Sequence, residues 1–381
     1  MRRDLAIIAS DVPCAAAGCF TQNKVQAEPV KLSIRHLQDN QAQVIVCNAG
    51  NANACTGNQG KLGAEAMADT VAELLQITPE DVVVASTGLI GEPFPTNDIV
   101  AGIKDNIFKL SDTSKAGSFA ANAILTTDTF PKEGFIEFDF EGTMINIAGM
   151  AKGSGMIHPN MATMLSFVCT DFNIDKHLLD EIVKYCVVRT FNMITVDGDT
   201  STNDMVIVLA NGLADNKKVE SREDPGYLLF REKLLEILTH LAKLIVSDGE
   251  GASKFIEYRV SKAKNEEVAR KLVKAISDST LVKTAMFGRD PNWGRIICAS
   301  GNAGVAFNYK KCDLHIGDLE NMVTVLKKGK PVDFDRNYVK KLLRESNIRV
   351  HLEVNTGDAE SIGWGSDLTT DYVLFNSVYT T

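Results

Sequence analysis

The chain has 381 residues, of which 45% are hydrophobic and 23% are charged, and its formal net charge is −9. These proportions are ordinary for a globular protein, and a chain of this length has a large core that usually forms two lobes. The negative charge leaves no basic stripe for nucleic acid, which excludes that partner but is compatible with a cationic substrate. No apolar stretch reaches about 18 residues, so we expect no membrane span.

The N-terminal residues and the cysteines both favour a cytoplasmic enzyme. Basic residues precede a short apolar run, but Asp4 interrupts the pattern, and we interpret this segment as a first strand rather than a signal peptide. The eight cysteines form no C-x-x-C pair, and the histidines show no His-x₃-His spacing. We therefore expect free thiols and no zinc site.

Hydrophobic periodicity predicts interleaved strands and helices. Strands are expected at 5–10, 42–47, 82–85, 135–140, 143–147, 164–170, 205–210, 312–317 and 350–354, with a hairpin turn at Glu141-Gly142. Helices are expected at 61–75, 95–110, 174–188, 227–246 and 266–277. Such interleaving predicts the α/β or α+β class.

The most informative segment is KGSGMIHPNMATML, which runs from Lys152 to Leu165. A glycine-rich loop, broken by Pro159, leads to Thr163 at the start of an apolar run. A threonine hydroxyl is a weak nucleophile, but an N-terminal threonine carries its own base, an α-amine with a pKa of about 7.7–8.0. Attack of the Thr163 hydroxyl on the carbonyl of Ala162 would break the chain and create that terminus. The spacing alone leaves an ordinary tight turn before a strand as an equal alternative.

Other polar positions allow both a chemical and a structural interpretation. Thr87 and Gly88 follow the apolar run 82–85, where they form either an oxyanion hole or an ordinary strand-end turn. Glu250 lies between two glycines after a long predicted helix, as either a ligand for an ammonium or a solvated helix end. Lys152, within the glycine loop, is either solvated or a ligand for a substrate carboxylate.

Three apparent motifs lead to no assignment. The segment 153–155 lacks the third glycine and the βαβ context of a dinucleotide loop. The segment 197–199 lacks the remainder of a calcium-binding pattern, so we assign no metal. His158 lies beside Pro159, and we interpret it as structural.

Together these motifs resemble the ornithine acetyltransferase family, also called glutamate N-acetyltransferase or arginine biosynthesis bifunctional protein. The cleavage motif 152–165 carries the resemblance, and one further block would add little. Eight further blocks in the family's order make it specific and extend it over nearly the whole chain: 11–13, 21–29, 48–54, 86–91, 126–129, 197–204, 248–254 and 288–295.

The resemblance implies an α/β fold in which β-sheets pack between helical layers, of the self-cleaved N-terminal-nucleophile type. Cleavage between Ala162 and Thr163 would produce an alpha chain, 1–162, and a beta chain, 163–381, which fold as one unit. Two of each would form a heterotetramer. By the same resemblance Thr163 is the nucleophile, Thr87 and Gly88 form the oxyanion hole, and the substrate-binding residues are Thr126, Lys152, Thr163, Glu250, Asn376 and Thr381.

The implied reaction transfers acetyl from N-acetylornithine to glutamate through an acetyl-threonine, in a ping-pong cycle of arginine biosynthesis. It needs no cofactor, and the resemblance leaves open whether acetyl-CoA is also a donor. The alternative is an N-terminal-nucleophile peptidase or amidase, which passes the acyl group to water. Lys152 and Glu250 favour an amino-acid acceptor. A binding protein without catalysis is a third alternative, which an uncut chain would favour.

Overall fold

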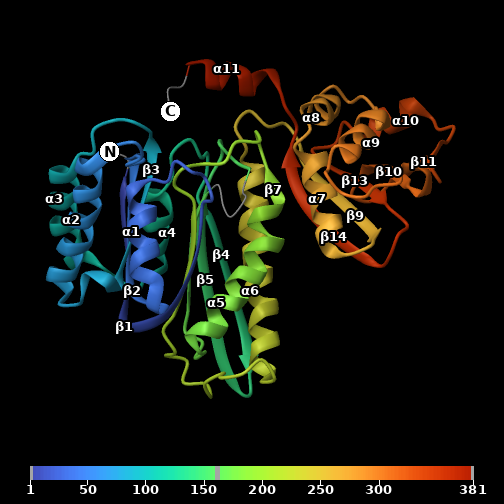
Figure 1. Ribbon diagram of the computed structural model, residues 1–381. Coiled ribbons are helices and arrows are strands. Elements are labelled where there is room, and N and C mark those ends of the chain that lie inside the picture. Colours follow the sequence, from blue (N-terminus) through green and yellow to red (C-terminus); the bar gives the residue numbers. More distant parts are fainter. Residues whose placement is uncertain (1–2, 159–163, 379–381) are drawn as a thin grey trace.

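Two seven-stranded β-sheets organise the computed structural model, which describes residues 3–158 and 164–378 (Figure 1). In spatial order the first sheet contains β3 (Val82–Leu89), β2 (Gln41–Asn51), β1 (Leu5–Phe20), β8 (Met205–Ala210), β6 (Leu165–Thr170), β5 (Thr143–Lys152) and β4 (Lys132–Phe140). Strands β6 and β8 therefore lie between β1 and β5. The first sheet is built from residues on both sides of position 163.

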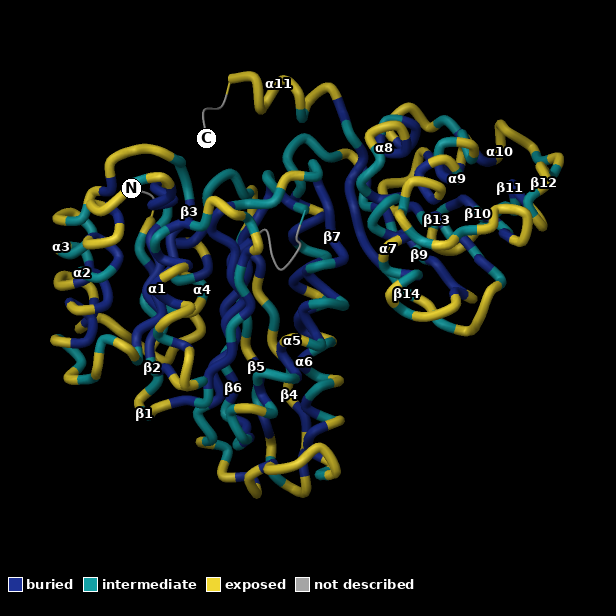
Figure 2. The backbone as a smooth tube through the Cα atoms, viewed as in Figure 1, coloured by how far each residue is buried: buried dark blue, intermediate teal, exposed yellow. Residues whose placement is uncertain are grey.

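Helices cover both faces of the first sheet. Helices α5 (Lys176–Arg189) and α6 (Pro225–Ser247) pack against β1, β4 and β5, whereas α4 (Ser114–Ala123) packs on β1 from the opposite side. Helices α1 (Glu28–His36), α2 (Gly57–Leu75) and α3 (Thr96–Asn106) form a layer beside β2 and β3. Figure 2 shows the strands as mostly buried and the outer helices as partly exposed.

The second sheet forms the other half of the molecule, at the right of Figure 1. In spatial order it contains β12 (Lys330–Pro331), β11 (Met322–Lys327), β10 (Asp313–Asp318), β13 (Asn347–Glu353), β9 (Phe255–Ala263), β14 (Ala359–Ser366) and β7 (Ile194–Thr195). Its helices are α7 (Glu266–Ser277), α8 (Thr280–Phe287), α9 (Trp293–Gly301) and α10 (Arg336–Leu342). One hydrophobic core joins the halves, since Val206 of β8 and Val260 of β9 belong to the same cluster.

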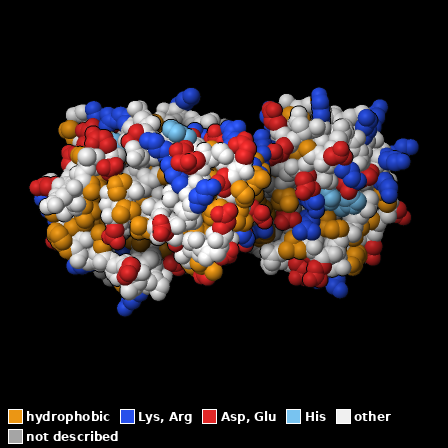
Figure 3. All heavy atoms as spheres, turned by 90° about the horizontal axis from the view of Figure 1, so that it is seen from below, with side chains coloured by type: hydrophobic (Ala, Val, Ile, Leu, Met, Phe, Trp, Pro, Cys, Tyr) orange, Lys and Arg blue, Asp and Glu red, His pale blue; other side chains and the backbone are white. Residues whose placement is uncertain are grey.

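A last helix, α11 (Thr370–Val378), crosses from the second half over the end of the first sheet (Figure 1). None of its described side chains is buried. Across the face shown in Figure 3, acidic and basic side chains are interspersed. Within 3–158 and 164–378, every helix is too short or too polar to cross a bilayer. All eight cysteines lie in these ranges, and all are free.

The expected α/β class is confirmed, as is each predicted helix and strand, although most of the bounds differ. The predicted strand 5–10 continues to Phe20 because an irregularity between Ala9 and Cys14 lets one strand serve two partners. Its first part pairs with β2, and residues Ala15–Phe20 pair with β8. The second part, AAAGCF, has little β propensity of its own, so only pairing in the sheet determines it.

We expect Phe172→Ala to reduce the free energy of unfolding by about 3–5 kcal/mol, because truncating a buried ring leaves a cavity. The Phe172 ring is fully buried, stacks on Phe230 at 4.7 Å between centroids, and meets Phe140 edge-on at 5.6 Å. Chemical denaturation measures the loss. The matched control is Phe135→Ala, whose side chain is 62% exposed and whose effect should stay within about 0.5 kcal/mol. Equal losses in both variants would contradict this account of the core.

Candidate active site

A cavity of about 240 Å³ opens where β3 and β5 end, beneath α11. Six residues singled out from the sequence line this one cavity: Thr87, Gly88, Thr126, Lys152, Glu250 and Asn376. They come from positions as distant as 87 and 376, so their convergence is a property of the fold. The other predicted site residues, Ala162, Thr163 and Thr381, lie outside the described residues.

Thr87 and Gly88 lie in the last part of β3, where β2 runs parallel to it. Gly88 has a φ of +134°, and a Cβ atom at this position would lie 2.3 Å from the carbonyl carbon of Gly50. Both facts require glycine, because no other residue tolerates this backbone conformation together with so close an approach of β3 to β2. The neighbouring Thr87 is buried, and its hydroxyl accepts a hydrogen bond from Lys152.

Lys152 occupies the last position of β5, paired with Leu165 of β6. The expectation that Lys152 lies within the glycine loop is therefore wrong, because pairing in the sheet extends β5 five residues beyond its predicted end. Its Nζ donates to the Thr87 hydroxyl at 3.1 Å and to the Thr126 hydroxyl at 2.8 Å. These bonds hold a largely buried ammonium against the cavity wall.

Glu250 follows the end of α6, and two side chains bind its carboxylate. It accepts hydrogen bonds from the Thr127 hydroxyl at 2.6 Å and from Nδ2 of Asn376 at 3.1 Å. A Cβ atom on Gly155 would lie 2.3 Å from this carboxylate, so the glycine allows the close approach. Asp248 caps α6 and is buried, and Glu250 lies two residues beyond it and is half-buried. Thr127, the neighbour of Thr126 in the resembling block 126–129, contacts Glu250, and Thr126 contacts Lys152.

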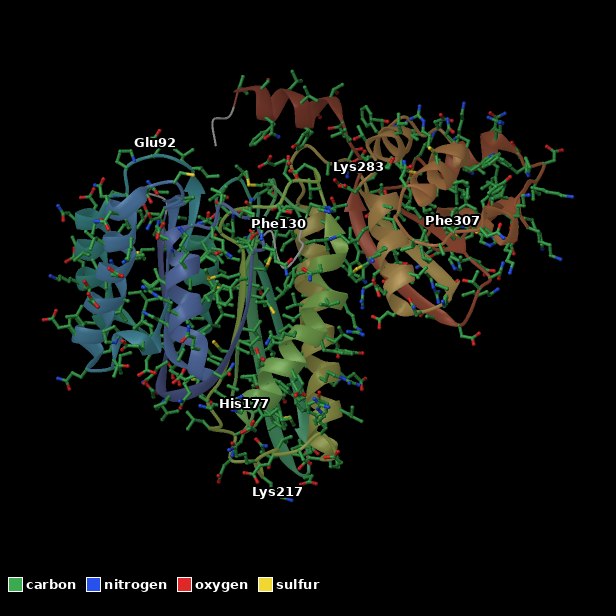
Figure 4. The ribbon with its side chains drawn as sticks, in the orientation of Figure 1. Glu92, Phe130, His177, Lys217, Lys283 and Phe307 are labelled. Carbon is green, nitrogen blue, oxygen red and sulfur yellow. The ribbon has the colours of Figure 1, made fainter. Side chains whose placement is uncertain are left out.

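A buried ion cluster lies behind the cavity, and we define it as Lys132, Asp128 and Asp248. The Lys132 ammonium contacts Oδ1 of Asp128 at 2.7 Å and Oδ2 of Asp248 at 2.6 Å, and the side chains of Lys132 and Asp128 are fully buried. Phe130, labelled in Figure 4, lies just before the start of β4, and its ring also faces this ammonium. A buried charge requires such compensation, since desolvation of an unpaired ion costs several kcal/mol.

Asp128 connects this cluster to the cavity. Its carboxylate accepts the N–H of Gly153 at 2.6 Å and the N–H of Thr126 at 3.0 Å. Burial alone would raise the pKa of Asp128, but the charges of Lys152 and Lys132 and the hydrogen bonds from Lys132 and Gly153 outweigh it and lower the pKa to about 2. Asp128 therefore stays ionised and fixes the backbone on both sides of the Lys152 ammonium.

Several cavity residues had no assigned role in the sequence. They are Leu89, Ile90, Gly155, Met156, Asp197, Asp199, Ser201, Thr202, Asn203 and Tyr372. All but Tyr372 lie in the cleavage motif 152–165 or in the resembling blocks 86–91 and 197–204, which was the available signal, whereas Tyr372 had none. His158 lies apart from this lining, with Nδ1 3.2 Å from the Thr195 hydroxyl and 3.4 Å from Oδ1 of Asp278. Within the described ranges, no three His, Cys, Asp or Glu side chains are placed to share a metal ion.

The fold and this cavity define an α/β enzyme whose site offers opposite charges to a small substrate. The chain belongs to the ArgJ family, whose sequence model matches residues 1–381. It is 48% identical to the arginine biosynthesis bifunctional protein ArgJ of Symbiobacterium thermophilum, covering 100% of this chain and 93% of that protein. It is 46% identical to the ArgJ protein of Caldanaerobacter subterraneus, covering 100% of this chain and 94% of that protein.

A solved structure agrees with these relatives. The crystal structure of the ArgJ protein from Bacillus halodurans matches 57% of this chain and 100% of its own, at 44% identity and a TM-score of 0.54. The resemblance to the ornithine acetyltransferase family is thus confirmed. The chain is an acetyltransferase of arginine biosynthesis, which decides against a peptidase or a binding protein.

We expect Lys132→Met to reduce the free energy of unfolding by about 3–5 kcal/mol, because it leaves two buried carboxylates without their cation. Chemical denaturation at pH 7 measures the change. Lys271→Met is the matched control, since it breaks the exposed pair with Glu267 and should cost less than about 1 kcal/mol. A loss below about 1 kcal/mol in Lys132→Met would show that the ion cluster does not stabilise the fold.

Proposed function

We propose that this enzyme carries acetyl from N-acetylornithine to glutamate as an ester on Thr163. The observation that carries the proposal is the convergence of Thr87, Gly88, Lys152 and Glu250 on one cavity. The same cavity adjoins the segment before the predicted cleavage site, because Gly155 and Met156 line it. Leu165, two residues after Thr163, pairs with Lys152 at its edge.

Maturation would come first. The Thr163 hydroxyl attacks the carbonyl carbon of Ala162, the peptide C–N bond breaks, and the amine of Thr163 is released as an ester forms. Water then hydrolyses this ester and leaves a carboxylate on Ala162. The products are the chains 1–162 and 163–381, the second with a free α-amine that serves as a base.

Acetyl transfer would follow in two half-reactions. The α-amine takes the proton of the Thr163 hydroxyl, whose oxygen attacks the acetyl carbonyl, and ornithine leaves with a proton on its nitrogen. Thr87 and Gly88 would stabilise the negative charge that develops on the carbonyl oxygen. The amine of glutamate then attacks the acetyl ester, which yields N-acetylglutamate and restores the hydroxyl.

Substrate selection would use the two charged sides of the cavity. The Lys152 ammonium fits a substrate carboxylate, and the Glu250 carboxylate fits a substrate ammonium. Thr126, Asn376 and Thr381 complete the proposed binding set. Support comes from the hydrogen bonds that already orient these charges through Thr126 and Asn376.

The proposal extends to the donor, the assembly and the location. The relatives are named bifunctional, which supports acetyl-CoA as a second donor for the acetylation of glutamate.

A heterotetramer of two 1–162 chains and two 163–381 chains is proposed, and the exposed apolar side chains of Val373, Leu374 and Val378 on α11 suit an interface. We place the enzyme in the cytoplasm, in keeping with its free cysteines.

Mass spectrometry under denaturing conditions should show chains of 162 and 219 residues, and product analysis should show ornithine and N-acetylglutamate from N-acetylornithine and glutamate. Thr163→Ala should leave one uncut chain without activity. Adding acetyl-CoA in place of N-acetylornithine tests the second donor. An active enzyme that remains uncut would contradict the threonine mechanism, and release of acetate instead of N-acetylglutamate would restore the amidase alternative.

Thr87→Ala should lower turnover by roughly 10²–10³-fold, the effect of removing one oxyanion donor. The KM for N-acetylornithine should change far less, because the charge develops only along the reaction path. Steady-state kinetics must use protein whose cleavage has been verified, since Thr87 also lies near the cleavage segment. Thr78→Ala, on an exposed turn, is the control. A large rise in KM at normal turnover would make Thr87 a binding residue.

A further inference from the structure

The carboxylate of Asp197 binds the backbone that leads to the predicted cleavage site. It accepts the N–H of Met156 on Oδ2 at 2.6 Å and the N–H of Ile157 on Oδ1 at 2.9 Å. The N–H of Asp199 also reaches Oδ1, at 3.2 Å. Asp197 and Met156 both line the cavity, so these bonds lie at the edge of the candidate site.

The bound backbone has an unusual conformation. Met156 has a φ of +55°, in the left-handed region, which is unfavourable for a residue other than glycine. Such a conformation persists only where the surrounding structure determines it. Two adjacent N–H groups on one carboxylate provide that constraint, because both bonds would be lost if the backbone relaxed.

The segment around Asp197 holds the same backbone by further contacts. The N–H of Val196 donates to the carbonyl of Ile157 at 2.6 Å, and the Thr200 hydroxyl donates to the carbonyl of His158 at 2.8 Å. Val196 follows β7, which pairs with β14 of the second sheet. The second half of the molecule thus anchors the segment that precedes the cleavage site in the first.

Asp197 also contacts the C-terminal helix. Tyr372, on α11, lines the cavity together with Asp197, and its side chain interacts with the Asp197 carboxylate. Burial raises the pKa of this phenol, so its hydroxyl stays protonated. One turn further along α11, Asn376 donates to Glu250. The buried cation Lys283, which Figure 4 labels where the two halves meet, interacts electrostatically with Asp197 and offsets its charge.

We propose that Asp197 is a positioning residue that fixes the backbone before the cleavage site and, through Tyr372, the helix that brings Asn376 to Glu250. This inference rests on the proposed function, since it presupposes cleavage before Thr163. Asp197 would touch neither the acetyl group nor the reacting atoms. Its role is to keep one conformation of the cavity wall before and after maturation.

The first test follows cleavage of newly synthesised precursor by denaturing electrophoresis in a cell-free system. Asp197→Asn should slow cleavage at least tenfold, because an amide places an N–H group against one of the two backbone donors. Asp171→Asn is the matched control: Asp171 also accepts a backbone N–H, from Asn146 at 2.8 Å, but it lies just after β6 and does not line the cavity. Its cleavage should match the wild type, and circular dichroism should show both variants folded.

The second test separates the two contacts of Asp197. Tyr372→Phe removes one hydroxyl, so cleavage should proceed at the wild-type rate while the KM for N-acetylornithine rises about two- to tenfold at nearly unchanged kcat. Cleavage at the wild-type rate in Asp197→Asn would overturn the proposed role of Asp197 in holding the backbone. An unchanged KM in Tyr372→Phe would overturn the proposed role of its contact with Tyr372. If Asp197→Asn fails to fold, Asp197→Glu, which keeps the charge but moves the carboxylate, tests the backbone contact in the same assay: slowed cleavage supports the contact, and cleavage at the wild-type rate overturns it. A wild-type chain that never cleaves would instead overturn the proposed function.

Discussion

The Lys132 ammonium, buried between Asp128 and Asp248, is the interaction on which the cavity depends. These carboxylates come from the loop before β4 and from the end of α6, so one cation joins two distant parts of the chain. Each carboxylate also binds backbone: Asp128 holds Gly153, and Asp248 holds Thr129. The cost of burying these charges makes the arrangement nearly obligatory, because removing one partner leaves an uncompensated ion.

The polar geometry of the cavity follows from this cluster. Asp128 fixes the backbone at Thr126 and Gly153, and the Thr126 hydroxyl in turn orients the Lys152 ammonium. On the other side, the hydroxyl of Ser154 donates to the carbonyl of Asp248 at 2.5 Å, close to Glu250. The Lys152 ammonium and the Glu250 carboxylate are thus held apart at fixed positions. A substrate that carries both charges requires such an arrangement for its recognition.

The second half of the molecule completes the site although its sheet lies elsewhere. Strand β7 joins that sheet and is followed directly by the segment that lines the cavity. Helix α11 follows β14 and brings Tyr372 and Asn376 over the cavity (Figure 1). The two sheets share a hydrophobic core, so movement of one half would disturb the cavity wall formed by the other.

The sequence by itself determined the features that depend on neighbouring residues. Periodicity predicted the helix at 227–246 and the hairpin at Glu141-Gly142, because both are local patterns, and the motif from Lys152 to Leu165 indicated the family. Only the tertiary structure decided that Lys152 ends a strand and that β1 continues to Phe20, since pairing partners determine both. It also decided the contacts of Asp128 and Asp197. Their hydrogen bonds join segments 25 to 41 residues apart, and the conformation of the intervening chain determines such contacts, which no local pattern encodes.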